Sequence, residues 1–430
     1  MGMAALLLAV PSPAQKLIPA GEGWAGNSVN VTVFRKNSLV THGNLQFIAY
    51  YDADGYVVLG KRKRKTDKWT LRRTRYRGNV RDAHNTISIM ADGEGYLHMA
   101  WNHHNRPLQY VRSTAPLSLE LGEPETMTGQ NEMRVTYPEF YRMPDGGLLF
   151  LYRDGQSGQG NLVLNRYDLK SRKWIRLHDN LIDGEGERNA YSQTCVDEKG
   201  VIHVSWVWRE AGDVASNHDL CYACSPDGGV TWQKSDGEKY TLPIRAASAE
   251  YVCRIPQNSE LINQTSMTAD DLGRPYIASY WREAGSEVPQ YHVVYYDGKV
   301  WHDRNTGFRS VPFTLRGGGT KRIPISRPQV VTKTRGTRTS VYLIFRDAER
   351  NDRISVAVNP DIGRNEWNVV DLTSFGVGSW EPSYDTELWK NEGRLHLFVQ
   401  RATQVDGEGV AQVPPERVQV LEVKLEQTAR

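Results

Sequence analysis

One hairpin pattern recurs along the chain, and it limits the possible folds more than any other feature of the sequence. One copy runs from His84 to His104, another from Tyr191 to Glu210, and a third from Gln264 to Glu283. Each copy reads as a strand, an Asp/Gly turn and a second strand. Because a hairpin returns to the edge where it began, its end residues should share an edge. A ring of such hairpins would gather these end residues on one face of the molecule.

The spacing of the turns predicts a propeller. The turn glycines Gly95, Gly147 and Gly200 recur about every fifty residues, which is the period of four strands and their loops. The seven copies begin near Val31, His84, Thr136, Tyr191, Gln264, Ser326 and Trp380. The segment from Val418 to Lys424 is a further strand that could close the ring. We therefore expect an all-β fold, a seven-bladed β-propeller of four-stranded antiparallel blades.

Residues 16–430 are expected to form this propeller as a single domain. Residues 1–15 contain a short apolar run followed by Pro11-Ser12-Pro13-Ala14, which resembles the end of a secretion signal. We exclude residues 1–15 from the fold as a residual signal peptide or tail, and we expect a secreted or periplasmic protein. No other segment approaches the roughly 18–20 apolar residues of a membrane span. The net charge of +3 gives no argument for binding nucleic acid.

Two short motifs have structural interpretations. Cys221 and Cys224 have the spacing of a metal knuckle, but their strand-like segment would point them to opposite faces. Buried thiols are the favoured interpretation, and a metal site formed by His218 and Cys221 stays open. The segment Ser225–Trp232 matches the Asp-box pattern S-x-D-x-G-x-T-W, in which the aspartate bonds nearby backbone N–H groups. The Asp box is a structural turn and does not indicate an activity.

The shared hairpin edge is rich in Arg, His and Tyr and poor in carboxylates. Strand starts supply His84, Tyr137, Tyr191, Gln264, Arg327 and Glu381, and strand ends supply His104, Arg153, Arg209, Arg282 and Arg346. Most of these arginines are followed by an acid, so pairing with that neighbour is one alternative. The whole set indicates an acidic ligand, with Arg327 and Glu381 among its expected contacts. Hydrolysis by paired carboxylates is disfavoured because only Glu381 is available.

The same residue types suit β-elimination from a uronic acid. In that reaction Arg and protonated His neutralise the carboxylate, so that the proton on C5 becomes acidic. A His or Tyr removes the proton, and a Tyr can protonate the leaving oxygen.

Five stretches of the sequence resemble the BNR-repeat propeller carbohydrate enzymes, a group that includes ulvan lyases and L-rhamnose-α-1,4-D-glucuronate lyases. The stretches are Asp82–Asn85, Trp101–His104, Thr136–Pro138, Tyr152–Gly155 and Trp208–Glu210. These lyases have a histidine pair with the same spacing as His84 and His104, and a tyrosine–arginine pair with the same spacing as Tyr137 and Arg153. The resemblance extends over nearly the whole chain.

The resemblance implies a polysaccharide lyase that cleaves the L-rhamnose-α-1,4-D-glucuronate bond of an acidic plant or algal polysaccharide or oligosaccharide, such as rhamnose-capped arabinogalactan. Tyr137 would be base and acid, His84 a base or its helper, and His104 and Arg153 the groups that neutralise the carboxylate. The implied substrate contacts are Arg209, Tyr191 and Asn189. The chemistry needs no cofactor, a structural calcium or zinc ion with unknown ligands is possible, and we expect a monomer.

Three other functions stay open at this point. Related propellers include exo-α-L-rhamnosidases, which hydrolyse the same bond with one histidine on the opposite face, and His42 in the first turn would be that residue here. The others are an endo-acting ulvan lyase and a non-catalytic glycan-binding propeller. The absence of a conspicuous Lys-rich loop beside the site favours the rhamnose-capped substrate over sulfated ulvan.

Overall fold

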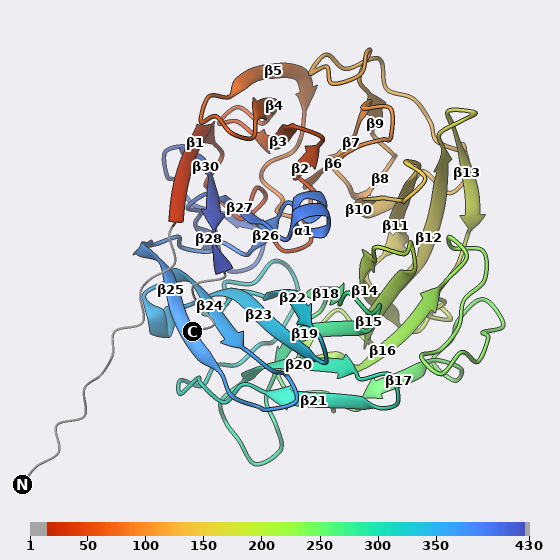
Figure 1. The fold of residues 1–430 in the computed structure, drawn as a ribbon, viewed down its shortest axis with the longest axis vertical. Coiled ribbons are helices and arrows are strands. Elements are labelled where there is room, and N and C mark those ends of the chain that lie inside the picture. The colour runs from red at the N-terminus through yellow and green to blue at the C-terminus, as the bar shows by residue number, and fades with distance from the viewer. Residues whose placement is uncertain (1–14, 426–430) are drawn as a thin grey trace, which may run out of the picture.

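A computed structural model describes residues 15–425 and confirms the seven-bladed β-propeller (Figure 1). Blade 1 consists of β2 (Leu39–His42), β3 (Leu45–Tyr51), β4 (Tyr56–Lys63) and β5 (Thr70–Arg77). Blade 2 consists of β6 (Ile87–Ala91), β7 (Leu97–Trp101) and β9 (Tyr110–Arg112). Blade 3 consists of β10 (Val135–Arg142), β11 (Leu148–Gln156), β12 (Gln159–Asp168) and β13 (Lys173–His178). A short strand, β8 (His104–Arg106), adds to the inner edge of blade 3 by pairing with β10.

The last four blades follow the same pattern. Blade 4 consists of β14 (Asn189–Val196), β15 (Ile202–Arg209), β16 (Asn217–Ser225) and β17 (Glu250–Cys253), and blade 5 of β18 (Ser266–Ala269), β19 (Pro275–Trp281), β20 (Gln290–Tyr296) and β21 (Trp301–Asn305). Blade 6 consists of β22 (Gln329–Arg335), β23 (Arg338–Asp347), β24 (Arg353–Asn359) and β25 (Asn368–Gly376). Blade 7 consists of β26 (Ser383–Tyr384), β27 (Leu395–Val399), β30 (Glu416–Val423) and β1 (Gln15–Gly23). A small hairpin of β28 (Gln404–Val405) and β29 (Gly409–Val410) extends from blade 7.

Blade 7 closes the ring with strands from both ends of the chain. The expected closing strand is β30, and it pairs with β27 on one side and with β1 on the other. The N-terminal strand is therefore the outermost strand of the last blade. Of the predicted signal peptide or tail, residues 1–15, residues 1–14 lie outside the described residues, whereas Gln15 is the first residue of β1. The other predicted domain limits stay predictions.

Three of the repeated hairpins, those of blades 2, 4 and 5, share one turn chemistry. The Oδ1 atoms of Asp92, Asp197 and Asp270 each accept the backbone N–H of the residues two and four positions later. The glycine three positions after each aspartate has a φ of 83 to 86°, which a residue without a Cβ adopts readily. The aspartate and the glycine together fix the tight return that keeps both hairpin ends at one edge.

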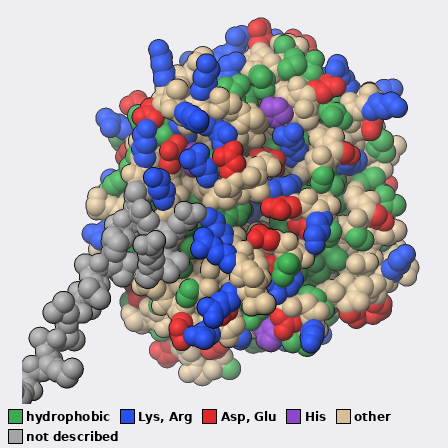
Figure 2. All heavy atoms as spheres, in the orientation of Figure 1, with side chains coloured by type: hydrophobic (Ala, Val, Ile, Leu, Met, Phe, Trp, Pro, Cys, Tyr) green, Lys and Arg blue, Asp and Glu red, His purple; other side chains and the backbone are tan. Residues whose placement is uncertain are grey.

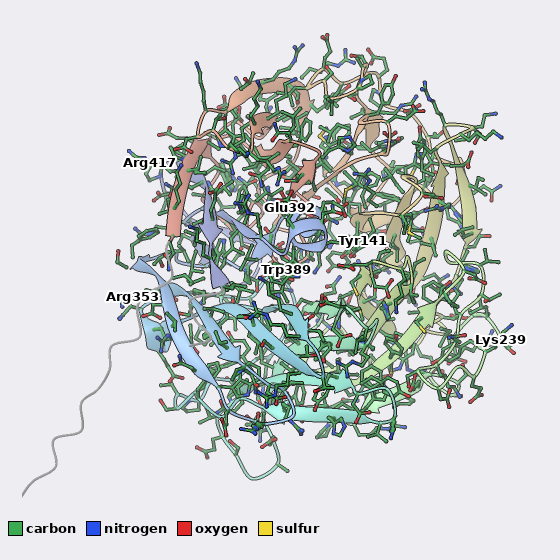
Figure 3. All side chains as sticks on the ribbon, viewed as in Figure 1. Tyr141, Lys239, Arg353, Trp389, Glu392 and Arg417 are labelled. Carbon is green, nitrogen blue, oxygen red and sulfur yellow. The ribbon has the colours of Figure 1, made fainter. Side chains whose placement is uncertain are left out.

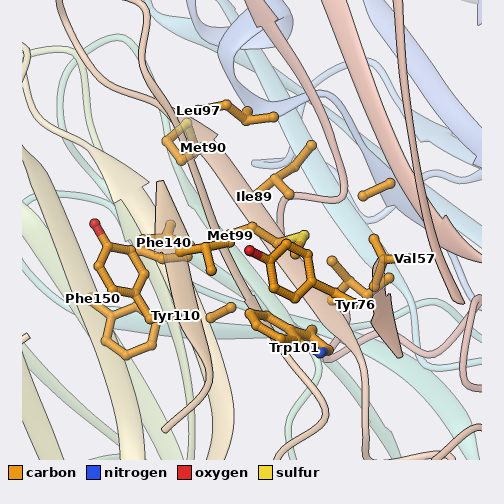
Figure 4. Close-up of a cluster of buried hydrophobic side chains, with 14 of the residues drawn as sticks. Val57, Tyr76, Ile89, Met90, Leu97, Met99, Trp101, Tyr110, Phe140 and Phe150 are labelled. Carbon is orange, nitrogen blue, oxygen red and sulfur yellow. The ribbon is translucent and has the colours of Figure 1, made fainter. Parts of the chain in front are cut away.

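The core lies between neighbouring blades. One cluster joins blades 1 to 3, with Val57, Met99, Trp101 and Phe140 packed together (Figure 4). Every residue of β6 and β7 is buried, including the polar Ser88 and His98, so both faces of these inner strands pack inside the molecule.

Both structural motifs form as expected. In β16, Cys221 packs in the cluster between blades 3 and 4, whereas Cys224 packs in a different cluster, so the two thiols face opposite ways. Asp227 of the Asp box accepts the backbone N–H groups of Val230 (3.1 Å) and Thr231 (2.9 Å). Within residues 15–425 no helix is both long and apolar enough to cross a bilayer.

Candidate functional site

The hairpin edges of the propeller meet around a cavity of about 230 Å³ at one end of the central channel. Nine of the eleven expected hairpin-end residues line this cavity: His84, His104, Tyr137, Arg153, Tyr191, Arg209, Arg327, Arg346 and Glu381. They belong to five of the blades or to the loops that precede them. Gln264 and Arg282 of blade 5 do not line the cavity, so the strand starts and strand ends converge as predicted in the other blades that supply them.

A single carboxylate holds the two histidines. Asp82 Oδ1 lies 2.9 Å from Nδ1 of His84, and Asp82 Oδ2 lies 2.6 Å from Nδ1 of His104. The two imidazole rings stack with their centroids 4.0 Å apart. Because Asp82 accepts from Nδ1 of both rings, each Nε2 is left for the cavity, where a neutral imidazole accepts a proton and a protonated imidazole donates to an anion.

Tyr137 lies next to this histidine pair because β10 is irregular at its start. His104 pairs with Thr136, and the register shifts between Thr136 and Glu139. Tyr137 adopts a φ of 56°, a left-handed conformation that is rare for an aromatic residue. Its ring centroid is 6.0 Å from that of His84 and 5.1 Å from that of Phe34. Such strain is typical of functional positions.

Arg153 and Arg209 are directed at tyrosines and not at the acids that follow them in the sequence. The guanidinium of Arg153 lies 5.0 Å from the ring centroid of Tyr137, and that of Arg209 lies 5.4 Å from the ring centroid of Tyr191. Asp154 pairs instead with Arg134, and Glu210 pairs with Arg188 and His218. Pairing with the sequence neighbour is thus wrong for both arginines, and two cations face the cavity.

The surroundings push the pKa values of the two tyrosines in opposite directions. Burial raises the pKa of Tyr137 well above its ordinary value, despite the nearby guanidinium groups. Burial also acts to raise the pKa of Tyr191, but the charges of Arg153 and Arg209 outweigh it and lower that pKa. Tyr137 is therefore held protonated, as a proton donor must be.

The histidine and its carboxylate are also shifted. Burial lowers the pKa of His84, although the hydrogen bond with Asp82 opposes that shift. Burial acts to raise the pKa of Asp82, but the hydrogen bonds from His104 and His84 hold it far below its usual range. At neutral pH the site thus offers a charged carboxylate behind an uncharged imidazole.

Three expected substrate contacts have partners within the protein. Arg327 donates to Glu381 through Nε (2.8 Å) and Nη2 (2.6 Å), and Glu381 also accepts the backbone N–H of Val33. Asn189 lies behind Arg153, and its amide oxygen accepts from Arg153 Nη1 (3.2 Å) when the amide is turned to satisfy its neighbours. Substrate contact by these residues stays a prediction.

His42 lies away from this cavity, at the end of β2 on the opposite face. It is partly buried, and its Nδ1 is 3.1 Å from Nη1 of Arg142. Burial and the charge of Arg142 lower the pKa of His42.

The opposite face has a larger cavity of about 580 Å³ beside α1 (Thr386–Glu392). Tyr141 and Trp389 border it near the central opening (Figure 3), and charged side chains of both signs surround the middle of this face (Figure 2). His42 is not among the residues that line this cavity. The expected hydrolase alternative thus has a histidine on the predicted face but outside the main cavity of that face.

Two clusters among the described residues have the composition of a metal site: Asp82, His84 and His104, and Glu283, His292 and Asp303. Each carboxylate oxygen of Asp82 already accepts a hydrogen bond from one of the two histidines. In the second cluster His292 Nδ1 lies 3.0 Å from an oxygen of Asp303, again the distance of a hydrogen bond. The expected calcium or zinc ion stays a prediction.

Sequence reasoning missed three residues of the site. Asp82 stands in one of the quoted stretches, and its position two residues before His84 was the available signal. Phe34 stacks on His84 with centroids 5.6 Å apart, and Glu408 Oε1 lies 3.7 Å from Nδ1 of His84. Phe34 precedes β2 and Glu408 lies in the turn between β28 and β29, so neither stands at a predicted strand start or strand end.

The sequence matches one family model and is similar to ulvan lyases over part of its length. Residues 45–309 match the model of a BNR repeat-containing family. The short isoform of ulvan lyase from Alteromonas sp. (strain LOR) is 33% identical over 153 residues, which are 32% of this chain and 29% of that protein. The long isoform from Pseudoalteromonas sp. (strain PLSV) is 27% identical over 216 residues, 44% of this chain and 21% of that protein. The matched part is less than a third of either relative.

Solved structures share the fold over most of the chain. The polysaccharide lyase Uly1 superposes with a TM-score of 0.66 at 18% identity, covering 90% of each chain. A PL25 ulvan lyase bound to -[GlcA(1-4)Rha3S]- superposes with a TM-score of 0.71 at 13% identity, covering 94% of this chain and 96% of the other. At these identities the likeness describes the fold.

Proposed function

The chain belongs to the BNR repeat-containing family, and on that premise we propose that it is a polysaccharide lyase that cleaves by β-elimination at a uronic acid. The observation that carries the proposal is one arrangement: two histidines clamped by Asp82 face a strained Tyr137 and two cations in a single cavity. The sequence similarity to ulvan lyases supports the same reaction class.

Each chemical step has a residue of matching chemistry. Arg153 and His104 bind the carboxylate of the uronate, which stabilises the negative charge that develops when C5 loses its proton. The neutral imidazole of His84 takes that proton through Nε2 while Asp82 holds Nδ1. The protonated phenol of Tyr137 donates to the leaving oxygen as the C4–O bond breaks and the C4=C5 double bond forms.

This assignment refines the expectation that Tyr137 is both base and acid. The pKa of His84 is lowered and that of Tyr137 is raised, so the base and the acid are separate groups in their reactive protonation states near neutral pH. Tyr191 and Arg209 complete the wall of the cavity on the far side of Arg153.

We propose further that the bond cleaved is L-rhamnose-α-1,4-D-glucuronate in an acidic plant or algal polysaccharide such as rhamnose-capped arabinogalactan. The small cavity and its cationic side support a short acidic ligand. We also propose that the protein is secreted or periplasmic, because a polymeric substrate lies outside the cell. We propose further that it acts as a monomer.

Incubation with rhamnose-capped arabinogalactan, and separately with ulvan, tests the proposal. Near-UV absorbance reports the 4,5-unsaturated uronate, and free rhamnose is measured in the same samples. We expect both signals to rise together, to be lost in Tyr137→Phe, and to persist in the control His42→Ala. Rhamnose released without absorbance, and lost only in His42→Ala, would make the protein a hydrolase acting at the opposite face. Saturable binding of these glycans without either product would leave a binding module.

A further inference from the structure

A second cavity, of about 310 Å³, lies beside the cavity of the proposed active site. Lys321 and Ile323 line both cavities, so the two spaces share a wall. Arg316 and Arg322 also line the second cavity, which therefore has three cationic side chains and one acidic side chain, that of Asp406. No Lys-rich loop was expected beside the site, and here arginine supplies most of the positive charge.

The loop that carries these cations is fixed to the rest of the protein at several points. Leu315, at its start, is buried in the cluster between blades 5 and 6. The backbone N–H of Gly317 donates to Asp213 Oδ1 (2.6 Å), and that of Thr320 donates to Glu408 Oε1 (3.0 Å). The cationic side chains therefore extend from an ordered backbone, which reduces the entropy that is lost when they bind a ligand.

The two arginines of the loop have no acidic partner in contact with them. Arg316 Nη1 donates to the amide oxygen of Asn258 (2.9 Å), which is uncharged. Both arginines are exposed, and within residues 15–425 neither guanidinium forms an ion pair with a carboxylate. The oxygens of Asp406 are occupied, because one accepts from Lys321 Nζ (3.0 Å) and the other from the backbone N–H of Arg322 (3.0 Å). Lys321 thus balances the one acid of the cavity, and two positive charges remain for a ligand.

We propose that the second cavity is a subsite for an anionic group of the substrate, a carboxylate or a sulfate on a sugar beyond the uronate at which the chain is cleaved. The inference rests on the proposed function and adds a second negative charge to the substrate. A guanidinium binds either group through a fork of parallel hydrogen bonds. The shared wall gives the glycan a continuous path, because a chain that leaves the first cavity past Lys321 enters the second.

The subsite separates acidic glycans that contain the same cleavable bond. A cap whose only acidic group is the cleaved uronate would leave Arg316 and Arg322 without a partner, whereas sulfated ulvan offers a further anion to them. These arginines line the second cavity and not the first, so they hold the substrate without touching the reacting atoms. Their loss should therefore raise KM and leave kcat unchanged.

The kinetics of Arg316→Gln/Arg322→Gln on ulvan test the subsite. We expect KM to rise on the order of 5- to 10-fold, with kcat within about twofold of wild type. The matched control is Arg335→Gln/Arg364→Gln, which removes the same charge from two other exposed arginines, of which Arg335 lines the cavity of the opposite face. A KM that changes equally in both double variants, or in neither, would overturn the inference.

Salt and desulfation identify the contact and its anion. Raising the ionic strength should raise the KM of wild type more steeply than that of Arg316→Gln/Arg322→Gln, because the screened contacts are absent from the variant. With chemically desulfated ulvan, a difference in KM between the two proteins that disappears assigns the subsite to sulfate. A difference that persists assigns it to the carboxylate of a second uronate. Equal salt dependence of the two proteins would count against the subsite.

Calorimetric titration of Tyr137→Phe with ulvan, with and without the two arginine changes, distinguishes failure of the subsite from failure of the proposed function. Unsaturated product from wild type, with equal affinities in the two titrations, would overturn the subsite and leave the lyase proposal standing. No product from wild type, with weaker binding when the arginines are replaced, would remove the lyase proposal and keep the subsite as a glycan-binding site. The absence of both product and binding would remove both.

Discussion

At the scale of single residues, Asp82 is the positioning residue of the site because both imidazoles depend on it. Asp82→Asn keeps the shape but can accept from only one Nδ1–H, so one histidine loses its favoured tautomer. We expect kcat/KM to fall on the order of 10²- to 10⁴-fold, the range for carboxylates that orient a catalytic histidine.

Asp92→Asn is the matched control for this change. Asp92 also contacts a histidine, with Oδ2 3.2 Å from Nε2 of His98, but this pair is buried inside blade 2. We expect Asp92→Asn to lower thermal stability and to leave the pH profile of the remaining activity unchanged. A pH profile of Asp82→Asn that is identical to that of wild type would contradict the positioning role.

The pH dependence of kcat/KM separates His84 from Tyr191 as the base. A base must be deprotonated, and burial lowers the pKa of His84 from 6.5, so activity should rise with pH and level off by about pH 6.5. The acid must be protonated, and the raised pKa of Tyr137 keeps it so far into the alkaline range. A rising limb on the alkaline side of neutrality, abolished in Tyr191→Phe, would assign the base to Tyr191 instead.

Sequence spacing predicted His84, His104, Tyr137 and Arg153 because each stands at a hairpin end, where the repeat fixes its place. The positive φ of Tyr137 could not be predicted, since it comes from a register shift that β8 and β11 impose on β10. Phe34 reaches the site from the segment before β2, where no strand end marked it, and stacks on His84.

At the scale of single elements, the Asp box should stabilise blade 4 without affecting chemistry. Asp227 accepts from Ser225 Oγ (2.8 Å), Thr231 Oγ1 (2.6 Å) and two backbone N–H groups. Because the side chain is exposed, water replaces part of these bonds, and we expect Asp227→Ala to cost about 1 kcal/mol and lower Tm by roughly 1–3 °C. Asp236→Ala removes a side chain that accepts one backbone N–H, from Glu238, and is the matched control. Calorimetry and an activity assay test both variants. An Asp227→Ala protein that is fully folded but inactive would contradict the structural role.

Inner strands were predictable, and edge elements were not. The outer strand β5 carries no readable strand pattern, because its exposed residues include four arginines and lack the alternation of a half-buried strand. In blade 7 the expected first strand is reduced to Ser383–Tyr384, because α1 starts directly afterwards. Asp385 caps that helix by accepting the N–H of Leu388, and Gly393 ends it with a φ of 60°. This Asp and Gly pair was a readable helix signal in the sequence.

At the scale of the whole molecule, the seven-blade ring followed from the turn period, but the way in which it closes did not. A strand near the C-terminus was expected to close it, and β30 does lie in blade 7. The outermost strand is β1, which a sequence reading could not assign because the strand has no hairpin partner nearby. Both ends of the described chain thus meet in one blade (Figure 1).

This closure predicts that damage to β1 destabilises the whole propeller. Ile18 is 1% exposed and stands opposite Val420 in the β1–β30 pair, and Val420 packs in the cluster that joins blades 6, 7 and 1. Ile18→Asp would bury an unpaired charge there, at a cost of at least about 3 kcal/mol. Since a propeller opened at one blade loses packing on both neighbours, urea unfolding should show one transition with a lower midpoint, and product formation should fall along the same curve.

Lys16→Ala on the same strand is the matched control. Its only side-chain contact among those identified is an ion pair with Asp67, and both side chains are 55% exposed, so its loss should cost less than about 1 kcal/mol. If Ile18→Asp instead unfolded in two steps, with blade 7 melting first and activity surviving that step, the ring would tolerate opening. Activity would then depend on the local packing of blades 2 and 3, which carry the histidine pair and Tyr137, and not on the closed ring.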